Sequence, residues 1–335
     1  MTEPLVSAKM ITYNHAPYIV QAIEGVLQQK TNFPFELVIG EDCSTDGTRA
    51  IVLEYQRKYS DIIRVITSDN NVGAYENIRR TSKACRGRYV AFCDGDDFWH
   101  DPSKLQKQTD YLETHPECGL VYSSYDVYHP KSNKTIKDFI RYRNWEMPKN
   151  PCLLDFIEGK SGIGLGVLTC TVMLRRHLYE EVKTSDPYLH LSGHFRMGDT
   201  QLWAELSTKT QFHYIAESLA THIITEESAT RSKDVKKRLQ FSISRAEMIL
   251  YLCNKYNLTG SYRKRYENDW SNYSLRLAFH LRDKELANKV RIRKKSFTGK
   301  EWFRYFGAKY LVIHYTYRTV AFLFSLFRKK NSQWL

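Results

Sequence analysis

The chain has 335 residues, enough for a large buried core, and an ordinary composition for a folded protein. Its net charge of +13 is unevenly distributed: residues 231–335 hold 25 Lys and Arg against 7 Asp and Glu, a net of +18, which leaves −5 for the first 230 residues. Seven scattered cysteines without a Cys-x-x-Cys pair exclude a disulfide framework and a zinc ribbon, and no stretch reaches the roughly 20 apolar residues of a spanning helix.

The first hundred residues alternate strand-like and helix-like segments. Apolar patterns typical of strands fill residues 5–12, 35–40, 62–67 and 88–93. Helical spacing follows each strand, with helices beginning near Ile19, Asp46, residue 74 and Pro102. Strands that alternate with helices of this length predict parallel βαβ units and therefore an α/β fold.

Two of these helices carry specific expectations. Asp46 is the expected N-cap of its helix. In the helix that opens at Pro102, Leu105 should face the core while Lys104 and Gln108 stay in solvent.

The pattern is less regular after residue 118. We expect a strand over 119–125, an irregular connection over 129–165, an inner strand over 167–174, a helix over 199–208, strands within 211–224 and helices beyond 233. Long connections near an active site are often lids or binding segments, so the connection and residues 186–198 should select a substrate.

Two predicted strands run directly into acidic loops, Glu41-Asp42-Cys43-Ser44-Thr45-Asp46 and Asp94-Gly95-Asp96-Asp97. Ligands of open α/β sheets bind beyond the carboxyl ends of the strands, so both loops should meet at one crevice. Divalent cations prefer carboxylate oxygens and share their shell with phosphate oxygens, and Gly95 permits close backbone approach. The loops therefore suit a nucleotide diphosphate bound with Mn²⁺ or Mg²⁺; a solvated turn and a helix-capping loop remain open alternatives.

Other candidate residues lie at the ends of predicted elements. Thr12, Tyr13 and Asn14 end the first strand and offer an aromatic face and an amide to a base. Asp199 precedes a helix, where it can act as an N-cap or as a general base. The histidines in this half of the chain show no metal-ligand spacing: His190, His194, His213 and His222.

Taken together, these motifs resemble glycosyltransferase family 2, in particular the bacterial members that build surface polysaccharides. The matching segments are Met10–Asn14, Glu41–Thr48, Gly87–Trp99 and Asp101–Gln108, and the likeness spans about 230 residues. Several motifs in the right order are far more specific than any one of them.

The resemblance implies a GT-A fold with a mostly parallel, Rossmann-like sheet and inverting transfer from a nucleotide-sugar donor, with a UDP-sugar favoured. It implies donor-binding roles for Thr12, Tyr13, Asn14, Asp42, Asp94 and Gly95. It further implies Mn²⁺ or Mg²⁺ at Asp96 and a general base at Asp199. Gly198 stands where the family usually has Glu, and His222 where Arg is common.

The expected organisation is a GT-A catalytic domain over residues 1–230 and a helical module over 231–335. The nucleotide-binding half should extend to about residue 127 and the acceptor half over 128–230, and the acceptor should be a glycan or a lipid-linked oligosaccharide. A sugar-nucleotide-binding protein without turnover remains an alternative. A hydrolase with an aspartyl nucleophile is another, although its Asp-x-Asp typically follows the first strand.

Residues 281–335 hold 14 Lys and Arg against 3 Asp and Glu, interleaved with aromatic residues. This mixture suits the headgroup zone of an anionic membrane. Because Met1–Pro4 leads directly into a strand without a signal-peptide pattern, we expect a cytoplasmic protein, peripheral on the cytoplasmic face of the membrane. A packed subdomain with a solvated basic face is one alternative, and a basic-aromatic nucleic-acid-binding protein is another. Without a recognised nucleic-acid motif, no nucleic-acid partner is expected.

Overall fold

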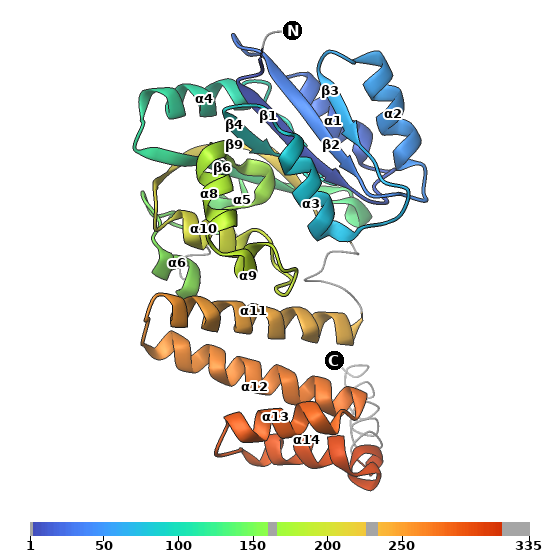
Figure 1. Ribbon diagram of the computed structural model, residues 1–335, viewed down its shortest axis with the longest axis vertical. Coiled ribbons are helices and arrows are strands. Elements are labelled where there is room, and N and C mark those ends of the chain that lie inside the picture. Colours follow the sequence, from blue (N-terminus) through green and yellow to red (C-terminus); the bar gives the residue numbers. More distant parts are fainter. Residues whose placement is uncertain (1–2, 160–165, 226–233, 317–335) are drawn as a thin grey trace, which may run out of the picture. The chain divides into compact units, whose positions relative to one another are not determined.

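The computed structural model describes residues 3–159, 166–225 and 234–316 (Figure 1). The chain forms two compact units. The first, here called the sheet unit, comprises Met1–His194 and Gly198–Thr225, and the second, the helical unit, comprises Phe195–Met197 and Glu226–Leu335. The expected boundary at residue 230 lies outside the described residues.

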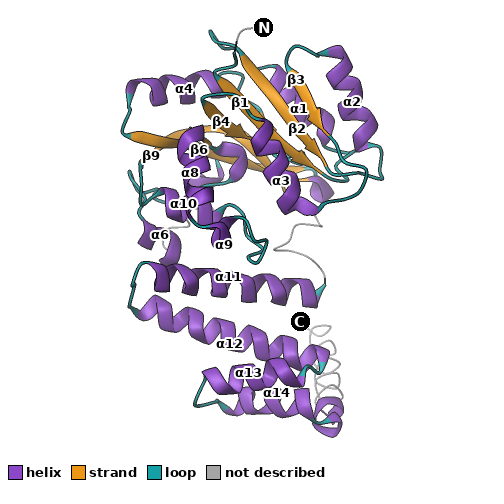
Figure 2. Ribbon diagram, viewed as in Figure 1, coloured by secondary structure: helices purple, strands orange, loops and turns teal. Residues whose placement is uncertain are grey.

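A sheet runs through the sheet unit with helices on its two faces (Figure 2). Its strand order is β3-β2-β1-β4-β8-β6-β9-β5, and β7 pairs with β6. The strands are β1 (Val6–Thr12), β2 (Phe35–Glu41), β3 (Ile63–Ile66), β4 (Tyr89–Phe92), β5 (Phe98–Trp99), β6 (Cys118–His129), β7 (Lys134–Ile136), β8 (Met173–Arg175) and β9 (Gln211–Ile223). The neighbouring strands β3, β2, β1 and β4 pair in parallel, and β8 pairs antiparallel with both β4 and β6. The predicted α/β fold is confirmed, with a sheet that is mixed beyond β4.

Helices connect the strands and form the described part of the helical unit. In the sheet unit they are α1 (Ile19–Leu27), α2 (Thr48–Lys58), α3 (Gly73–Ala84), α4 (Lys104–Thr114), α5 (Phe139–Tyr142), α6 (Leu153–Glu158), α8 (Arg176–Ser185), α9 (Pro187–His190) and α10 (Thr200–Leu206). In the helical unit they are α11 (Val235–Lys255), α12 (Ser261–Leu281), α13 (Lys284–Arg293) and α14 (Gly299–Lys309). No helix among the described residues is long and apolar enough to span a bilayer.

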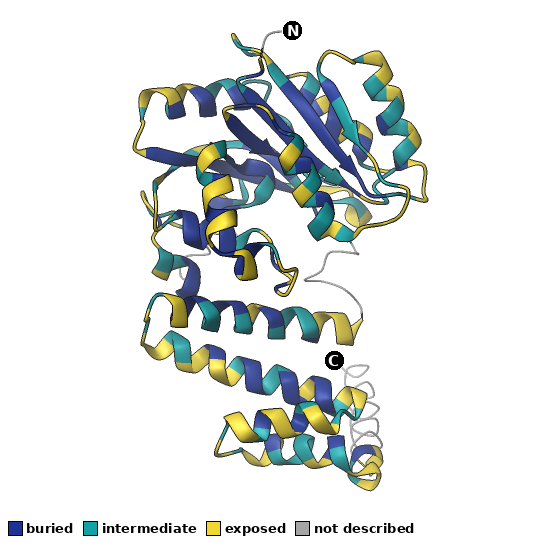
Figure 3. Cartoon of the chain, viewed as in Figure 1, coloured by how far each residue is buried: buried dark blue, intermediate teal, exposed yellow. Residues whose placement is uncertain are grey.

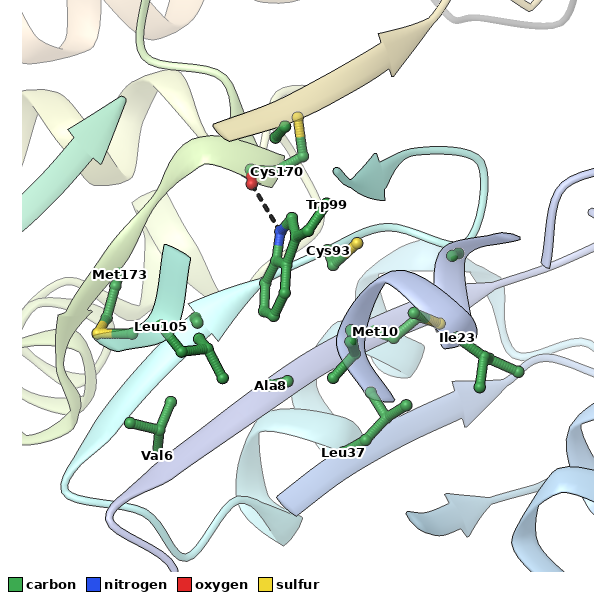
Figure 4. Close-up of a cluster of buried hydrophobic side chains, with 14 of the residues drawn as sticks. Val6, Ala8, Met10, Ile23, Leu37, Cys93, Trp99, Leu105, Cys170 and Met173 are labelled. Atoms are coloured by element: carbon green, nitrogen blue, oxygen red, sulfur yellow. Dashed lines mark hydrogen bonds between the residues drawn. The ribbon is translucent and has the colours of Figure 1, made fainter. Parts of the chain in front are cut away.

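Strand β1 shows how the core forms, because successive side chains point to opposite faces of the sheet. Val6, Ala8 and Met10 are fully buried in a cluster with residues of α1 and α4, including Ile23 and Leu105 (Figure 4). The central strands are accordingly buried, whereas the helices carry exposed residues on their outer faces (Figure 3).

The opposite face of β1 carries a buried charge. Lys9 is only 4 % exposed, and its Nζ donates to the Tyr179 hydroxyl on α8 at 3.1 Å. The Nζ also lies 4.5 Å from the centre of the Phe92 ring. Burial would raise the pKa of Tyr179, but Lys9 and Lys183 lower it to about 8. A lysine therefore sits within the sheet, close to the carboxyl end of β4.

The predicted irregular connection over residues 129–165 contains more structure than expected. After a short turn at Pro130–Ser132, Asn133 adopts a left-handed conformation and the chain returns as β7, antiparallel to β6. Asn tolerates this conformation better than most residues, which allows the tight return. Helices α5 and α6 follow, and residues 160–165 lie outside the described residues.

Two further expectations need correction. The predicted strand over 167–174 is reduced to β8, since a short turn occupies Thr169–Thr171. The N-cap position of α2 is Gly47, at φ 99°, rather than Asp46; the Asp46 carboxylate nevertheless accepts a hydrogen bond from the Thr48 backbone N–H at 3.0 Å. The local pattern also gave no signal for α8 and α9.

Lys104 and Gln108 were expected in solvent, and both are fully buried. The Lys104 Nζ donates to Gln108 Oε1 at 2.7 Å and lies 4.3 Å from the centre of the Trp99 ring. The Gln108 amide donates in turn to the Thr171 carbonyl at 2.8 Å. Tertiary partners far along the chain therefore override the solvent-facing pattern of α4.

Burial lowers the pKa of Lys104 from 10.5 to about 7. Between these values the unfolded chain binds more protons than the folded one, so the free energy of unfolding should rise with pH. Replacing Lys104 by Met should remove this rise. The free energy of unfolding of the variant minus that of the wild type should therefore be a few kcal/mol larger at pH 7 than at pH 10. Urea unfolding across this pH range measures the difference. Lys83→Met, at an exposed position of α3, should leave the slope unchanged; a wild-type slope in Lys104→Met would contradict the interpretation.

Candidate active site at the carboxyl ends of the strands

The Asp94-Gly95-Asp96-Asp97 loop continues beside β1 after β4 ends. The Cys93 N–H donates to the Lys9 carbonyl at 3.0 Å, and the Gly95 N–H donates to the Ile11 carbonyl at 2.9 Å. These bonds hold the loop against the end of β1. A Cβ on Gly95 would lie 2.7 Å from Thr12 Oγ1 and 2.8 Å from Thr12 Cβ, closer than real Cβ contacts, and 3.0 Å from His15 Nδ1. Glycine is therefore required by the close approach of these two segments.

Replacing Gly95 by Ala should displace the loop, because the new methyl group has no space. We expect the free energy of unfolding to fall by about 1–3 kcal/mol, as in other overpacked sites, and ligand affinity at the loop to fall with it. Thermal and urea unfolding measure the first effect. Gly299→Ala is the matched control, since a Cβ there meets nothing within 4 Å. Equal stability of the two variants would contradict this reading.

Four carboxylates interact electrostatically around this loop. Burial, followed by the negative charges of Asp96, Asp97 and Asp199, raises the pKa of Asp94 to about 7, and Lys9 opposes the rise. Burial and then Asp97 likewise raise the pKa of Asp96. Asp199 thus lies within electrostatic reach of the loop although it is distant in the sequence. The convergence of these residues on one site, and their individual roles, stay predictions.

Two histidines adjoin the acidic cluster. His222, near the end of β9, places Nδ1 2.9 Å from Asp97 Oδ1, which also accepts the Ile223 N–H at 2.9 Å. His15, after β1, opposes with His222 the rise in the pKa of Asp96. Sequence reasoning gave no role to His15 or Asp97, because only the fold brings β9 and the end of β1 to the loop.

Asp199 occupies the N-cap position of α10. Its Oδ1 accepts hydrogen bonds from the Thr200 N–H at 2.6 Å and from the Thr200 hydroxyl at 3.2 Å. The two predicted roles of Asp199, N-cap and general base, are therefore compatible. Oδ1 caps the helix, and Oδ2 accepts no hydrogen bond from the described residues.

Gly198 lines a small pocket of the sheet unit together with Tyr75, Tyr179, Lys183 and Leu202. A Cβ on Gly198 would meet only Ile78, at 3.9 Å. The absence of a side chain at residue 198 therefore keeps a pocket open immediately before Asp199.

The predicted nucleoside-binding residues lie at the ends of β1 and β2. Tyr13 is 43 % exposed and presents an accessible ring, while Thr12 is buried. The Asn14 side chain accepts the Thr45 N–H at 2.8 Å, so it holds the loop after β2. Asn14 itself has φ 55°, a conformation that Asn tolerates.

Asp42 is only 2 % exposed, and both carboxylate oxygens are engaged. Oδ1 accepts the Val72 N–H at 2.8 Å and Oδ2 accepts the Gly73 N–H at 3.0 Å, at the start of α3. Asp42 therefore fixes α3 to the sheet end, a structural role that the sequence did not reveal. Its contact with a nucleoside stays a prediction and would use the remaining lone pairs of these oxygens.

The donor set fits a divalent cation that is also held by phosphate oxygens. No group of three or more His, Cys, Asp or Glu side chains in residues 3–159, 166–225 and 234–316 is arranged to hold a metal by itself. Asp94 and Asp96 are hard oxygen donors whose burial and mutual repulsion a positive charge would relieve. Buried Thr12 Oγ1 and His15 Nδ1 find no hydrogen-bond partner in the described part, although buried polar groups normally have one. The crevice is thus suited to an additional polar ligand.

In open α/β sheets, ligands bind beyond the carboxyl ends of the strands, where the acidic loop of this chain lies. The family model described as Glycosyl transferase family 2 matches residues 7–182, and the chain belongs to this family. The predicted GT-A fold is confirmed by solved structures such as the mannosyltransferase PcManGT from Pyrobaculum calidifontis in complex with GDP-Man and Mn²⁺. The likeness has a TM-score of 0.51 at 15 % identity and covers 94 % of this chain and 87 % of that one.

Curated relatives match shorter parts of the chain. It is 43 % identical over 112 residues to the Mycobacterium tuberculosis protein Rv1520, covering 33 % of this chain and 32 % of that protein. It is 28 % identical over 195 residues to the Escherichia coli UDP-Glc:alpha-D-GlcNAc-diphosphoundecaprenol beta-1,3-glucosyltransferase WfgD, covering 57 % and 70 %. The chain thus spans about a third of the length of the first curated relatives it matches.

Proposed function

We propose that the protein is an inverting glycosyltransferase of surface-polysaccharide synthesis. It moves a sugar from a nucleotide-diphosphate donor, with a UDP-sugar favoured, to a hydroxyl of a glycan or lipid-linked acceptor. The observation that carries this proposal is the match to glycosyl transferase family 2 over residues 7–182, and the electrostatic influence of Asp199 on Asp94 supports Asp199 as the candidate base. The relative WfgD, named as a UDP-glucose-dependent transferase that acts on a lipid diphosphate sugar, supports this choice of donor and acceptor.

Asp96 would hold Mn²⁺ or Mg²⁺ together with the diphosphate of the donor, and Asp94 would lie near the ribose. The bound cation would supply positive charge to the leaving diphosphate. The Mn²⁺ of the PcManGT complex supports a cation in this fold. The exposed Tyr13 ring would face the base, and His15 Nδ1 and Thr12 Oγ1 would find polar partners on the donor.

In the transfer step, the acceptor oxygen attacks the anomeric carbon on the face opposite the diphosphate. The bond from the anomeric carbon to the phosphate oxygen breaks, and its electron pair leaves with the diphosphate. Asp199 Oδ2 takes the hydroxyl proton while Oδ1 stays bonded to the start of α10, which fixes the direction of the carboxylate. A single displacement of this kind inverts the anomeric configuration.

A thermal-shift panel of sugar nucleotides with and without MnCl₂ tests the donor assignment. A ligand that binds only the folded protein raises the unfolding temperature with the logarithm of its concentration over its affinity. We expect one nucleotide sugar to stabilise the protein only when Mn²⁺ or Mg²⁺ is present. No stabilisation by any donor at millimolar concentration would contradict the proposal.

We also propose that the helical unit binds an anionic membrane surface and brings the site to a lipid-linked acceptor. Some of its aromatic residues pack together instead, since Phe297 and Trp302 stack edge to face, with rings 5.2 Å apart, under the Arg291 guanidinium. Tyr310 and Tyr315 contact the rings of Phe306 and His314 but remain 53 % and 57 % exposed. Tyrosines and basic residues together favour the headgroup zone.

Replacing Tyr310 and Tyr315 by Ser should lower the fraction of protein that floats with phosphatidylglycerol vesicles several-fold, because two interfacial anchors are lost. The matched control replaces two exposed tyrosines of the sheet unit, Tyr142 and Tyr188, by Ser. Vesicle flotation at two salt concentrations measures both variants. Undiminished flotation of the Tyr310/Tyr315 variant would count against this surface.

A further inference from the structure

A cavity of about 330 Å³ lies between α11 and α12, and all its lining residues belong to the helical unit. It is separate from the acidic loop, whose residues belong to the sheet unit. Its polar lining includes Arg238, Ser242 and Arg245 from α11 and Tyr273 and Arg276 from α12. Its size is at the lower end of the range for small-molecule sites.

Helical spacing explains why these side chains meet. Residues 238, 242 and 245 follow one another at intervals of four and three on α11, and residues 266, 269, 273 and 276 do the same on α12. Each set therefore lies on one face of its helix. Buried Leu239 and Ala246 line the apolar floor, and the Trp270 Nε1–H bonds Glu247 between the helices at 2.9 Å. The two faces are held opposite one another by this packing.

The charges in the cavity are unbalanced. Three guanidinium groups line it and Asp269 is the one carboxylate among the lining residues. Arg263, on another face of α12, pairs with Glu267 at 3.3 Å. In contrast, the exposed Arg245 and Arg276 make no ion pair or hydrogen bond with the described residues. Two positively charged donors are thus available at the mouth of a preformed cavity.

The chemistry of the lining selects the kind of ligand. Guanidinium groups match phosphate oxygens with two parallel hydrogen bonds, and more than one of them favours a doubly charged phosphate over a carboxylate. Tyr266 and Tyr273 add aromatic surface, while Ser242 and Asp269 can bond hydroxyl groups. A phosphate that carries a sugar uses both parts of this lining.

We propose that the cavity between α11 and α12 binds a sugar phosphate, with Arg245 and Arg276 on the phosphate and Asp269 on the sugar hydroxyls. The ligand is either a soluble sugar phosphate or the phosphorylated sugar of a lipid. This inference goes beyond the proposed function and does not require it, because the site lies entirely within the helical unit.

Isothermal titration of the full chain with glucose 1-phosphate tests the inference. We expect binding by the wild type, no binding of glucose, and an affinity lower by on the order of tenfold or more in Arg245→Gln/Arg276→Gln, since two charge-assisted contacts are lost. Because both side chains are exposed, the variant should fold normally, and circular dichroism checks this. The matched control, Lys264→Gln/Lys289→Gln, removes the same two charges from exposed positions that do not line the cavity.

Two further measurements complete the test. The first distinguishes this site from the proposed active site, and the second identifies the source of the ligand. Asp96→Asn should bind glucose 1-phosphate as the wild type does, whatever the outcome of the donor panel. Neutral vesicles with a polyprenyl-diphosphate sugar should bind the wild type more strongly than the soluble compound if the source is a lipid, and no more strongly if it is not. Absent binding of both probes, or equal affinity in the arginine variant and the wild type, would overturn the inference.

Discussion

Replacing Asp199 by Asn should reduce sugar transfer by about 10²–10⁴-fold, the usual contribution of a general base, and leave donor affinity unchanged. The amide cannot take the acceptor proton. Its oxygen can still accept the Thr200 N–H, and Asn is as good an N-cap as Asp, so α10 should be preserved. Release of nucleoside diphosphate in the presence of acceptor measures turnover, and calorimetry measures donor binding.

Asp283→Asn is the matched control for this experiment. Asp283 is also an N-cap, accepting the Leu286 N–H at 2.9 Å at the start of α13 in the helical unit. The control should retain full turnover and similar stability. Retained turnover in Asp199→Asn would remove Asp199 as the base while leaving the donor site intact.

Replacing Asp96 by Asn should abolish the dependence of donor affinity on Mn²⁺. Changes to residues that merely support metal ligands cost about 10–100-fold in affinity, so loss of a ligand should weaken donor binding at least about 100-fold in the presence of Mn²⁺. Calorimetry with MnCl₂ and with EDTA measures the effect.

The same replacement, which should weaken donor binding, should not weaken the stability of the ligand-free protein. Asp97 raises the pKa of Asp96, and Asp96 raises that of Asp94, so removal of one negative charge should leave the ligand-free fold at least as stable. Asp61→Asn, at an exposed position, should change neither stability nor donor affinity. Donor affinity that still responds to Mn²⁺ in Asp96→Asn would contradict its role as ligand.

The regular part of the fold could be predicted because local patterns determine it. The strands β1 to β4 and the helices between them have apolar residues at the spacing of their elements, and each prediction agrees with the structure within a few residues. In contrast, β5 has two residues and β8 has three, too few for a periodic signal. Burial of Lys104 depends on Trp99 and Gln108, whose meeting with it only tertiary packing creates.

The candidate site shows the same division. The loop after β4 was predicted because ligand sites follow strand ends in this class of sheet. The pairing of Asp97 with His222 was not, since β9 reaches the loop through a sheet order that the sequence does not display. The two hydrogen bonds that Asp42 accepts from backbone N–H groups at the start of α3 were hidden for the same reason. For these missed features of the site, the sequence offered one local signal, which is Lys9, a charged residue within an apolar strand.

A crystal structure of the protein with its sugar nucleotide and Mn²⁺ tests the central claim most directly. We predict Mn²⁺ coordinated by Asp96 and by the donor diphosphate, the base against Tyr13, and the anomeric carbon facing Asp199. A donor bound elsewhere, with Asp96 and Asp199 both out of contact with it, would contradict the assignment of these carboxylates to one transferase site.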